Sequence, residues 1–303
     1  MLNNDYHIPV LFQESIDAMQ LDKGNVFVDV TYGGGGHSKE ILKRISKDAT
    51  LIAFDQDDDA LNNVVNDERL IFVNANFRFL KNFLKYYQLE NVDAILADLG
   101  VSSHQFDEAN RGFSIRSNAR LDMRMNQNAD LDAYKIVNKY SDKELYRVFN
   151  SYADLKNVGK VVPTIIKARK IKPIETTFDL VDLLKNLVKG KKQNQFLAQV
   201  FQAIRIEVND EMGALEDMLL QAEEVLNPGG RLVVISYHSI EDRLVKNFIK
   251  TGTFDGKVES DIYGNINAPL KAVNRKPIVP TDDENIKNTR ARSAKMRIAI
   301  KNG

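Results

Sequence analysis

Val26-Phe-Val-Asp-Val-Thr-Tyr-Gly-Gly-Gly-Gly-His-Ser38 is the stretch of sequence that decides the fold of this chain. Its first five residues are mostly β-branched and apolar, which predicts a short buried strand. A helix is predicted over 38–45, because apolar residues recur there on one face. Four consecutive glycines between them cost so much backbone entropy that packing alone explains them poorly. A glycine loop between a strand and a helix instead predicts a ligand site at the carboxyl end of that strand.

The alternation of strands and helices continues after the glycine loop. An amphipathic pattern over 77–87 predicts another helix, and short apolar runs predict three further strands at 51–54, 70–73 and 94–97. Strands that alternate with helices in this way form a parallel sheet covered by helices. We therefore assign the chain to the α/β class.

This alternation stops after about residue 105. The following sequence is polar and lacks strand-like runs, and its helical spacing predicts helices over 131–137, 142–152 and 178–188. The simplest arrangement is an all-helical domain inserted into one doubly wound sheet. We place the insert at 106–195 and the two parts of the sheet domain at 1–105 and 196–303.

The α/β pattern resumes after the insert. Apolar residues keep helical spacing from about Leu197 to Leu226, which predicts one long helix that ends at Asn227-Pro-Gly-Gly230. Arg231–Ser236 is then the fifth strand. The alternating stretch Lys295–Ile300 predicts an edge strand near the end of the chain.

Composition limits the compartment and the partners. Forty-two basic residues balance 42 acidic ones, so any surface for nucleic acid must be local. Two stretches, 156–172 and 285–303, each carry six basic residues and no acidic one, and are either solvated faces or phosphate contacts. The chain has no cysteine and no apolar run near the roughly 18 residues of a membrane span. We expect a cytoplasmic protein that does not associate with membranes.

The glycine loop and Asp55 indicate the class of cofactor. Asp55 ends the predicted second strand, 19 residues after Gly36, where a carboxylate can accept hydrogen bonds from both hydroxyls of a ribose. The loop lacks the third glycine of a dinucleotide fingerprint and the Gly-Lys-Ser/Thr of a phosphate-binding loop. A cofactor that has adenosine but no pyrophosphate fits better, and S-adenosylmethionine is the common case. A dinucleotide remains the alternative.

Asp98 ends the predicted fourth strand, in Asp98-Leu-Gly-Val-Ser-Ser-His-Gln105. A carboxylate there could accept a hydrogen bond from an exocyclic amine and orient its lone pair for methyl transfer. The alternative is that Asp98 only contacts the cofactor. Gln105 could contact the cofactor or the acceptor.

Ser236-Tyr-His-Ser-Ile-Glu-Asp-Arg243 follows the fifth strand and mixes structural with functional candidates. Ser239 with Asp242 predicts a capping box for the next helix. Tyr237 and His238 lie where they could stack on or hydrogen-bond a flipped base. His37 is either a residue of the cofactor loop or a helix start, and no second ligand is spaced to form a metal site with it.

These motifs together resemble the RsmH (MraW) family of bacterial 16S ribosomal RNA cytosine-N4 methyltransferases. The matching stretches occur in order over nearly the whole chain. Besides the stretches at Asp29–Ser38, Asp98–Ser103 and Ser236–Arg243, they are His7–Leu11 with Glu14, Arg111–Ser114, Leu121–Met125, Phe201–Asn209, Pro228–Leu232 and Asn288–Ser293.

The resemblance implies a class I, Rossmann-like methyltransferase sheet with a helical insert. It implies methyl transfer from S-adenosylmethionine to N4 of one cytidine in the decoding (P-site) region of 16S ribosomal RNA. The substrate would be the small ribosomal subunit or its late precursor, and a homodimer is compatible with the family. We expect no metal. Asp98 and His238 are the candidate catalytic residues. The residues that match the family's cofactor contacts are Gly35, Gly36, His37, Asp55, Phe77, Asp98 and Gln105. Candidates for RNA or active-site contacts are Arg124, Arg205, Asn209 and Tyr237.

Two other classes of function stay open at this point. A nicotinamide-dependent oxidoreductase is disfavoured by the missing third glycine. A ribosome-assembly factor that keeps the fold without catalysis is disfavoured by the intact glycine loop.

Overall fold

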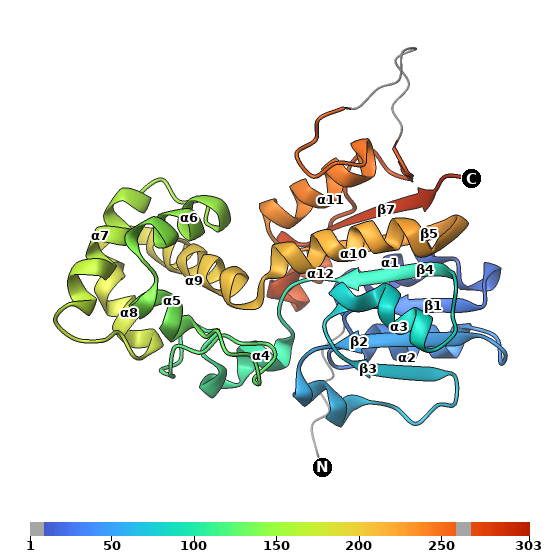
Figure 1. Cartoon of the computed structure of the whole chain (residues 1–303), viewed down its shortest axis with the longest axis horizontal. Helices are drawn as coiled ribbons and strands as arrows, with labels where there is room; N and C mark the ends of the chain where they lie inside the picture. The colour runs from blue at the N-terminus through green and yellow to red at the C-terminus, as the bar shows by residue number, and fades with distance from the viewer. Residues whose placement is uncertain (1–8, 259–267) are drawn as a thin grey trace. The chain divides into compact units, whose positions relative to one another are not determined.

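The computed structural model describes residues 9–258 and 268–303, and only the backbone of Ser103. His7 and Ile8 of the first family motif therefore lie outside the described residues. The chain forms two compact units (Figure 1). The first, here called the sheet unit, comprises the chain up to Gly100 and from Gly213 onward, and the second, the helical unit, is Val101–Met212.

The sheet unit is built on a seven-stranded sheet with the order β3-β2-β1-β4-β5-β7-β6. Strands β1 to β5 are parallel to one another, and β7 is antiparallel to both β5 and β6. The strands are β1 (Val26–Asp29), β2 (Thr50–Asp55), β3 (Leu70–Asn74), β4 (Val92–Asp98), β5 (Leu226–Ser236), β6 (Leu270–Ala272) and β7 (Lys295–Lys301). The predicted α/β class and Rossmann-like sheet are confirmed.

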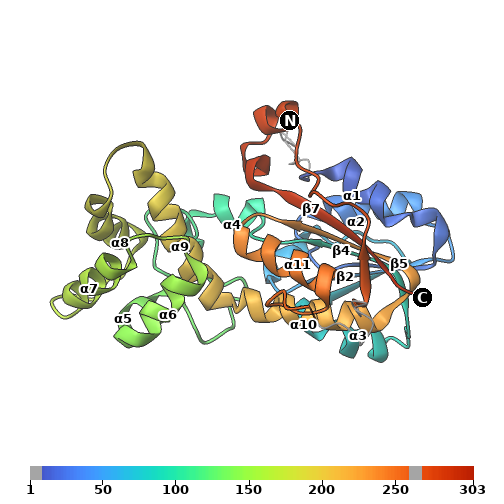
Figure 2. The same ribbon diagram turned by 90° about the horizontal axis from the view of Figure 1, so that it is seen from above.

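Helices cover both faces of this sheet (Figure 2). Helices α1 (Phe12–Met19) and α2 (Gly36–Arg44) lie on one face, and α3 (Leu80–Tyr86), α10 (Glu211–Val225) and α11 (Ser239–Thr251) on the other. The short helix α12 (Asp282–Lys287) precedes β7. Central strand residues such as Phe27, Leu51 and Ile95 are fully buried, as expected of parallel strands that are covered on both faces.

The predicted helix from Leu197 to Leu226 is wrong, because the structure has two helices there. Helix α9 (Gln193–Asn209) ends at Asp210, which adopts a left-handed conformation with φ 47°, and α10 begins at the next residue. The apolar residues of α9 keep helical spacing up to this break because they pack into the core of the helical unit. Buried Phe196, Val200 and Ile204 belong to that core.

The end of the sheet also differs from the prediction. α10 does end just before Asn227-Pro-Gly-Gly230, at Val225, but these residues already lie inside β5, where the pairing with β4 shifts between Val92 and Ala94. Lys295–Ile300 does form a strand, but β7 is not an edge strand, because it pairs with β5 on one side and β6 on the other. The edge strand on this side of the sheet is β6, a strand of three residues with no clear alternating pattern.

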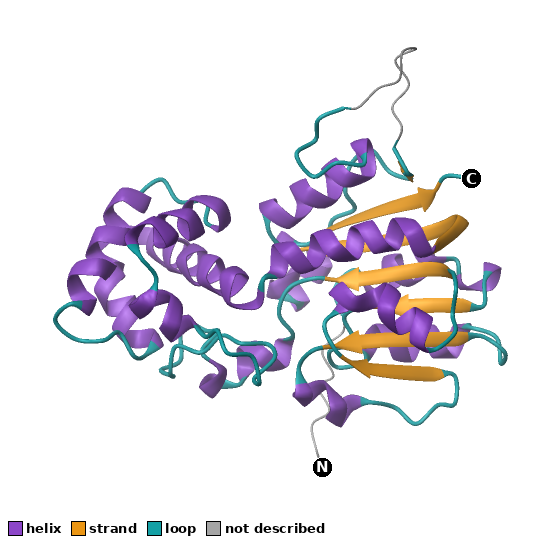
Figure 3. Cartoon of the chain, in the orientation of Figure 1, coloured by secondary structure: helices purple, strands orange, loops and turns teal. Residues whose placement is uncertain are grey.

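The helical unit consists of helices and loops (Figure 3), and it has a hydrophobic core of its own. Its helices are α4 (Ser103–Asp107), α5 (Ala133–Lys139), α6 (Asp142–Tyr152), α7 (Val158–Arg169), α8 (Thr177–Leu184) and α9. Leu145, Val161 and Leu180, from three of these helices, are completely buried together. Because α9 supplies part of this core, the unit extends to Met212 rather than to the predicted limit at 195.

The charges of the neutral chain are divided unequally between the two units. The helical unit carries 19 lysines and arginines against 14 acidic residues, and the sheet unit carries 23 against 28. The excess of basic residues is therefore confined to the helical unit, as expected of a chain whose net charge is zero. Within the described residues, no helix is both long enough and apolar enough to cross a membrane.

Candidate functional site

Three aspartates lie at the edge of the sheet that is formed by the carboxyl ends of its parallel strands. β1 ends at Asp29, β2 at Asp55 and β4 at Asp98, and these three strands are neighbours and parallel. The carboxyl ends of parallel strands meet at a single edge, which is where open α/β sheets bind their ligands. The sequence therefore brings three carboxylates to the expected place.

The glycine loop lies at the same edge, between β1 and α2. Gly35 has φ 74°, and a Cβ atom there would lie 2.7 Å from the Tyr32 hydroxyl oxygen. A Cβ atom on Gly36, the first residue of α2, would lie 2.5 Å from Pro9 Cγ. Gly34 is different, because a Cβ atom there would meet nothing within 4 Å. Packing thus requires glycine at 35 and 36, and the loop is open at Gly34.

Asp29 ties the two ends of the glycine loop together. Its buried carboxylate accepts a hydrogen bond from Ser38 Oγ at 2.7 Å and from the Thr31 backbone N–H at 3.0 Å. Burial raises the pKa of Asp29 above its ordinary value, and these hydrogen bonds oppose that effect. Asp29 was not among the site residues predicted from the sequence. A carboxylate in an otherwise apolar strand is the signal that could have identified it.

Asp55 holds the other side of the loop. Its Oδ2 accepts from the Gly33 backbone N–H at 2.8 Å and its Oδ1 from the Asp57 N–H at 2.9 Å. Burial raises the pKa of Asp55 to about 6, with smaller contributions from the charges of Asp57 and Asp29. Each carboxylate oxygen can accept a second hydrogen bond. The pair of acceptors required by the ribose prediction is therefore present at the sheet edge.

Asp98 is held by residues that directly follow its two neighbouring strands, β1 and β5. The Tyr237 hydroxyl, just beyond β5, donates a hydrogen bond of 2.7 Å to Asp98 Oδ1, and the Asp98 backbone N–H donates to Thr31 Oγ1 at 2.7 Å. Burial raises the pKa of Asp98 to about 7, and the negative charges of Asp29 and Glu241 add to this. The hydrogen bond from Tyr237 acts in the opposite direction. A carboxyl group with a pKa near neutrality can give and take protons at physiological pH.

His37 lies in the first turn of α2, beside Asp98. Its imidazole is buried, and Nδ1 is 3.8 Å from Asp98 Oδ2, too far for a hydrogen bond. Burial lowers the pKa of His37 to about 4, so the ring is neutral at pH 7. Among the described residues, no hydrogen-bond partner reaches His37 Nε2. A buried polar atom without a partner is compatible with a ligand contact.

The predicted capping box of Ser239 and Asp242 is wrong. His238 is the N-cap of α11, and its Nδ1 accepts a hydrogen bond from the Glu241 backbone N–H at 3.3 Å. Glu241 reaches back and accepts from the backbone N–H groups of Tyr237 and His238 at 2.8 and 3.2 Å. Asp242 instead pairs with Arg297 of β7 at 2.7 Å. The imidazole proposed for catalysis therefore also has a structural task.

Phe77 and Gln105 lie in different units. Phe77 opens a short 3-10 helix, Phe77–Phe79, directly after β3, so it belongs to the carboxyl edge of the sheet. Gln105 is buried in the helical unit, where its Oε1 accepts from the Ser102 backbone N–H at 3.0 Å and completes the capping box of α4. The sequence prediction of a cofactor contact at Gln105 remains a prediction.

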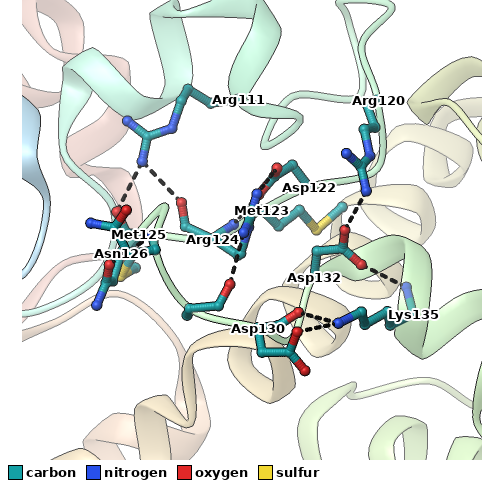
Figure 4. Close-up of polar contacts among 12 residues, drawn as sticks. Arg111, Arg120, Asp122, Met123, Arg124, Met125, Asn126, Asp130, Asp132 and Lys135 are labelled. Carbon is teal, nitrogen blue, oxygen red and sulfur yellow. Dashed lines mark hydrogen bonds and ion pairs between the residues drawn. The ribbon is translucent and has the colours of Figure 1, made fainter.

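Arg124 and Arg205, two of the candidate RNA contacts, form ion pairs within the helical unit. Arg124 donates to both carboxylate oxygens of Asp122, at 2.8 and 2.7 Å, and to the Ala129 carbonyl oxygen (Figure 4). Arg205 forms the same bidentate pair with Glu211, with two contacts of 2.8 Å. Both guanidinium groups thus stabilise the unit to which they belong.

Asn209, the third candidate, fixes the backbone of the Leu121–Met125 stretch. Its Oδ1 accepts from the Met125 N–H at 2.7 Å and its Nδ2 donates to the Met123 carbonyl oxygen at 2.8 Å. Met123 is fully buried and has φ 61°, a conformation that is costly for a residue with a Cβ atom. Asn209 therefore stabilises a strained turn.

Replacing Asn209 by alanine should lower the free energy of unfolding by about 1–3 kcal/mol, because two buried backbone groups lose their partner. Urea denaturation would measure this loss, with exposed Asn150→Ala on α6 as the matched control. If Asn209→Ala kept the stability of the wild type but bound RNA more weakly, Asn209 would be an RNA contact rather than a structural residue.

Comparison with known proteins gives consistent matches. The sequence profile described as the MraW methylase family matches residues 4–302. Proteins named ribosomal RNA small subunit methyltransferase H are similar over nearly their whole length. That of Christiangramia forsetii is 55% identical over 99% of both chains, and that of Phocaeicola vulgatus is 54% identical over 98% of this chain and 97% of its own. The match to a solved rRNA methylase of Streptococcus thermophilus has a TM-score of 0.42 and 12% identity over 96% of this chain and 95% of the other, too distant to support an argument.

Proposed function

Because the chain belongs to the MraW methylase family, we propose that it transfers a methyl group from S-adenosylmethionine to the RNA of the small ribosomal subunit. The observation that carries this proposal is the match of nearly the whole chain to relatives that are named for that activity. The finer proposal is that the acceptor is the exocyclic N4 of one cytidine in the decoding (P-site) region of 16S ribosomal RNA.

The sheet edge has suitable residues for this cofactor. When bound, S-adenosylmethionine supplies an electrophilic methyl group on a positively charged sulfur. We propose that Asp55 accepts hydrogen bonds from the ribose hydroxyls and that the open glycine loop admits the ligand at Gly34. The remaining contacts proposed from the resemblance are Gly35, Gly36, His37, Phe77, Asp98 and Gln105.

Asp98 is the residue we propose for the acceptor amine. Its Oδ1 already accepts a hydrogen bond from the Tyr237 hydroxyl, whereas among the described residues Oδ2 has only His37 Nδ1 nearby, at 3.8 Å. Oδ2 is therefore the oxygen that can accept a hydrogen bond from an N–H of the amine and so orient the nitrogen lone pair. The amine loses one proton once the new nitrogen–carbon bond has formed. A carboxyl group whose pKa is about 7 can take this proton and pass it to water.

His238 remains a second candidate for catalysis. Its Nδ1 already accepts the backbone N–H of Glu241, and its Nε2 lies 3.0 Å from Glu241 Oε1, without the direction of a hydrogen bond. A role in turnover would therefore depend on Nε2. In neutral histidine one ring nitrogen carries the proton and the other can accept a hydrogen bond. Because Nδ1 of His238 accepts a hydrogen bond, Nε2 is the nitrogen that carries the proton and donates.

The RNA surface that we propose lies on the helical unit. Lys156, Lys160, Lys167, Lys170 and Lys172, from the first basic stretch, are all exposed. In the second stretch, Lys295 and Arg297 instead pair with Asp242 of α11. Exposed lysines attract phosphates regardless of base sequence, so the first stretch is the better candidate for backbone contacts.

The proposed function is tested with the purified full chain, labelled methyl donor and small subunits from a strain that lacks the protein. We expect label in the ribosomal RNA, and mass analysis of its nucleosides should find N4-methylcytidine. Label on another base would overturn the finer proposal. Tight binding without any labelling would favour an assembly factor, and NADH binding in a spectroscopic titration would favour an oxidoreductase.

Replacing Lys167, Lys170 and Lys172 together by glutamine should raise KM for small subunits about 10-fold or more at physiological salt, with kcat unchanged, because phosphate contacts supply sequence-independent affinity. The matched control replaces Lys85, Lys246 and Lys250, which are exposed on the sheet unit. The same rise in KM in both triple variants would show a general charge effect rather than a surface on the helical unit.

A further inference from the structure

The hydroxyl group of Tyr237 connects two neighbouring strands at the sheet edge. In the register of the parallel strands, Asp98 of β4 lies opposite Ile235 of β5, and Tyr237 follows two residues later. Its side chain reaches across to the carboxylate of Asp98, where Oη donates to Oδ1 at 2.7 Å. A hydrogen bond to an ionised oxygen is about twice as strong as one between neutral groups.

Tyr237 is itself held from two sides. Its backbone N–H donates to buried Glu241 Oε2 at 2.8 Å, which fixes the residue at the start of α11. On the other side its ring lies against Gly100, where a Cβ atom would be 3.3 Å from Tyr237 Cδ2. Gly100 has φ 98°, a conformation that favours glycine. The hydroxyl therefore reaches Asp98 from a fixed position.

We propose that Tyr237 is a positioning residue for methyl transfer: its hydroxyl fixes Asp98 Oδ1 and leaves Oδ2 as the oxygen that receives the acceptor amine. This inference rests on the proposed function of the sheet edge. It also changes the role expected for Tyr237, from stacking on a base to holding a carboxylate.

The charges around Asp98 oppose its ionisation, so the hydrogen bond from Tyr237 matters for keeping Asp98 ionised. Asp29 on β1 and Glu241 on α11 are negative and favour the protonated form of Asp98, as burial does. His37 on α2 is neutral at pH 7 and does not offset them. The Tyr237 hydroxyl favours the ionised form of Asp98. The pKa of Tyr237 itself is raised well above 10 by burial and by Asp98, with smaller contributions from Glu241 and from Glu284 of α12. It therefore remains a donor throughout the working range of pH.

The decisive variant is Tyr237→Phe, which keeps the ring and removes only the hydroxyl. Without this donor the pKa of Asp98 rises further. We expect the acid limb of the kcat profile to move up by about one pH unit. At pH 7 the ionised fraction of Asp98, and with it kcat, should fall about 5-fold, with recovery at higher pH and little change in KM for small subunits. A tyrosine that only stacks on a base would tolerate phenylalanine.

A readout that does not depend on activity accompanies the kinetics. Carbon-13 NMR of the aspartate carboxyls, in protein without cofactor and assigned with Asp98→Asn, follows the titration of Asp98 directly. Its midpoint should rise in Tyr237→Phe. It should fall when 3-fluorotyrosine, a stronger donor of nearly the same shape, replaces Tyr237. The matched control is Tyr140→Phe in the helical unit, which removes a 2.9 Å hydrogen bond from Tyr140 Oη to the Glu207 carboxylate. It should leave both readouts unchanged.

The outcomes separate this inference from the function on which it rests. If neither the acid limb nor the Asp98 titration moves in Tyr237→Phe, or if Tyr140→Phe moves them equally, Tyr237 is not a positioning residue. If the wild type transfers no methyl group while the Asp98 titration shifts as expected, the proposed function fails and Tyr237 still controls the carboxylate. If Tyr237→Phe does not fold, the 3-fluorotyrosine protein decides, because an unshifted titration there overturns the proposal.

Discussion

Asp98→Asn should lower kcat by about 100- to 10,000-fold, the range over which a positioned acid or base contributes to a rate. Asparagine has nearly the same shape, and its Oδ1 can still accept the Tyr237 hydroxyl. What it loses is the negative charge and the ability to take the proton of the amine. Methyl transfer to small subunits measures this effect, and near-normal turnover would remove Asp98 from the mechanism.

The same variant should be more stable than the wild type in alkaline solution. The pKa of Asp98 is raised from 3.8 to about 7 in the folded protein. A group whose pKa is higher in the folded state binds its proton preferentially there, so stability is lost as the pH rises from about 4 through 7. At about pH 8 we expect Asp98→Asn to gain about 1–3 kcal/mol in the free energy of unfolding, and almost nothing at about pH 4.

Asp93→Asn, near the other end of β4, is the matched control. Asp93 Oδ2 accepts from the backbone N–H groups of Asn25 and Val26 at 2.7 and 3.0 Å, and hydrogen bonds of this kind lower the pKa of Asp93 despite burial. This variant should lose stability at about pH 8 and keep its turnover. If both variants changed stability in the same direction, the opposite pKa shifts of Asp98 and Asp93 would be wrong.

Asp55→Ala should weaken the binding of S-adenosylmethionine by about 1–3 kcal/mol, or about 5- to 150-fold, because the ribose hydroxyls lose their acceptor and the Gly33 N–H loses its partner. Since the pKa of Asp55 is about 6, affinity in the wild type should fall as the pH drops through 6 and the carboxylate gains a proton. Titration calorimetry measures both effects.

The control for Asp55 is Asp67→Ala, which removes a carboxylate just before β3 that pairs with Arg69. It should leave the affinity for the methyl donor unchanged, and the pH dependence should remain. An affinity of Asp55→Ala equal to that of the wild type would show that the ribose is held elsewhere.

The parts of the site that could be predicted are local in sequence. The glycine loop, Asp55 and Asp98 each follow a short apolar strand directly, and parallel pairing then brings the strand ends to one edge. The hydrogen bond from Tyr237 to Asp98 joins residues that are 139 positions apart. No rule based on spacing in the sequence predicts that contact, although each of the two residues had been identified as a candidate separately.

The errors have physical causes of two kinds. Asp210 interrupts a helical pattern whose apolar spacing is continuous, because α9 packs into the core of the helical unit whereas α10 from Gly213 onward belongs to the sheet unit. His238 caps α11 in place of Ser239, since its imidazole nitrogen accepts the same backbone N–H that a hydroxyl would. For Arg124 and Asn209, the resemblance identified important positions but not their partners. Those partners lie within the helical unit.

The continuity of the helical unit has a consequence for the newly synthesised chain. That unit is one uninterrupted stretch, whereas the sheet unit needs both ends of the sequence. At about 5–20 residues per second, β5 is synthesised roughly 6–25 s after β4, and β4 lacks that neighbour until then. The helical unit can complete its core in this interval. We therefore expect it to fold first on the ribosome, while the first four strands wait with an unpaired edge that is open to aggregation.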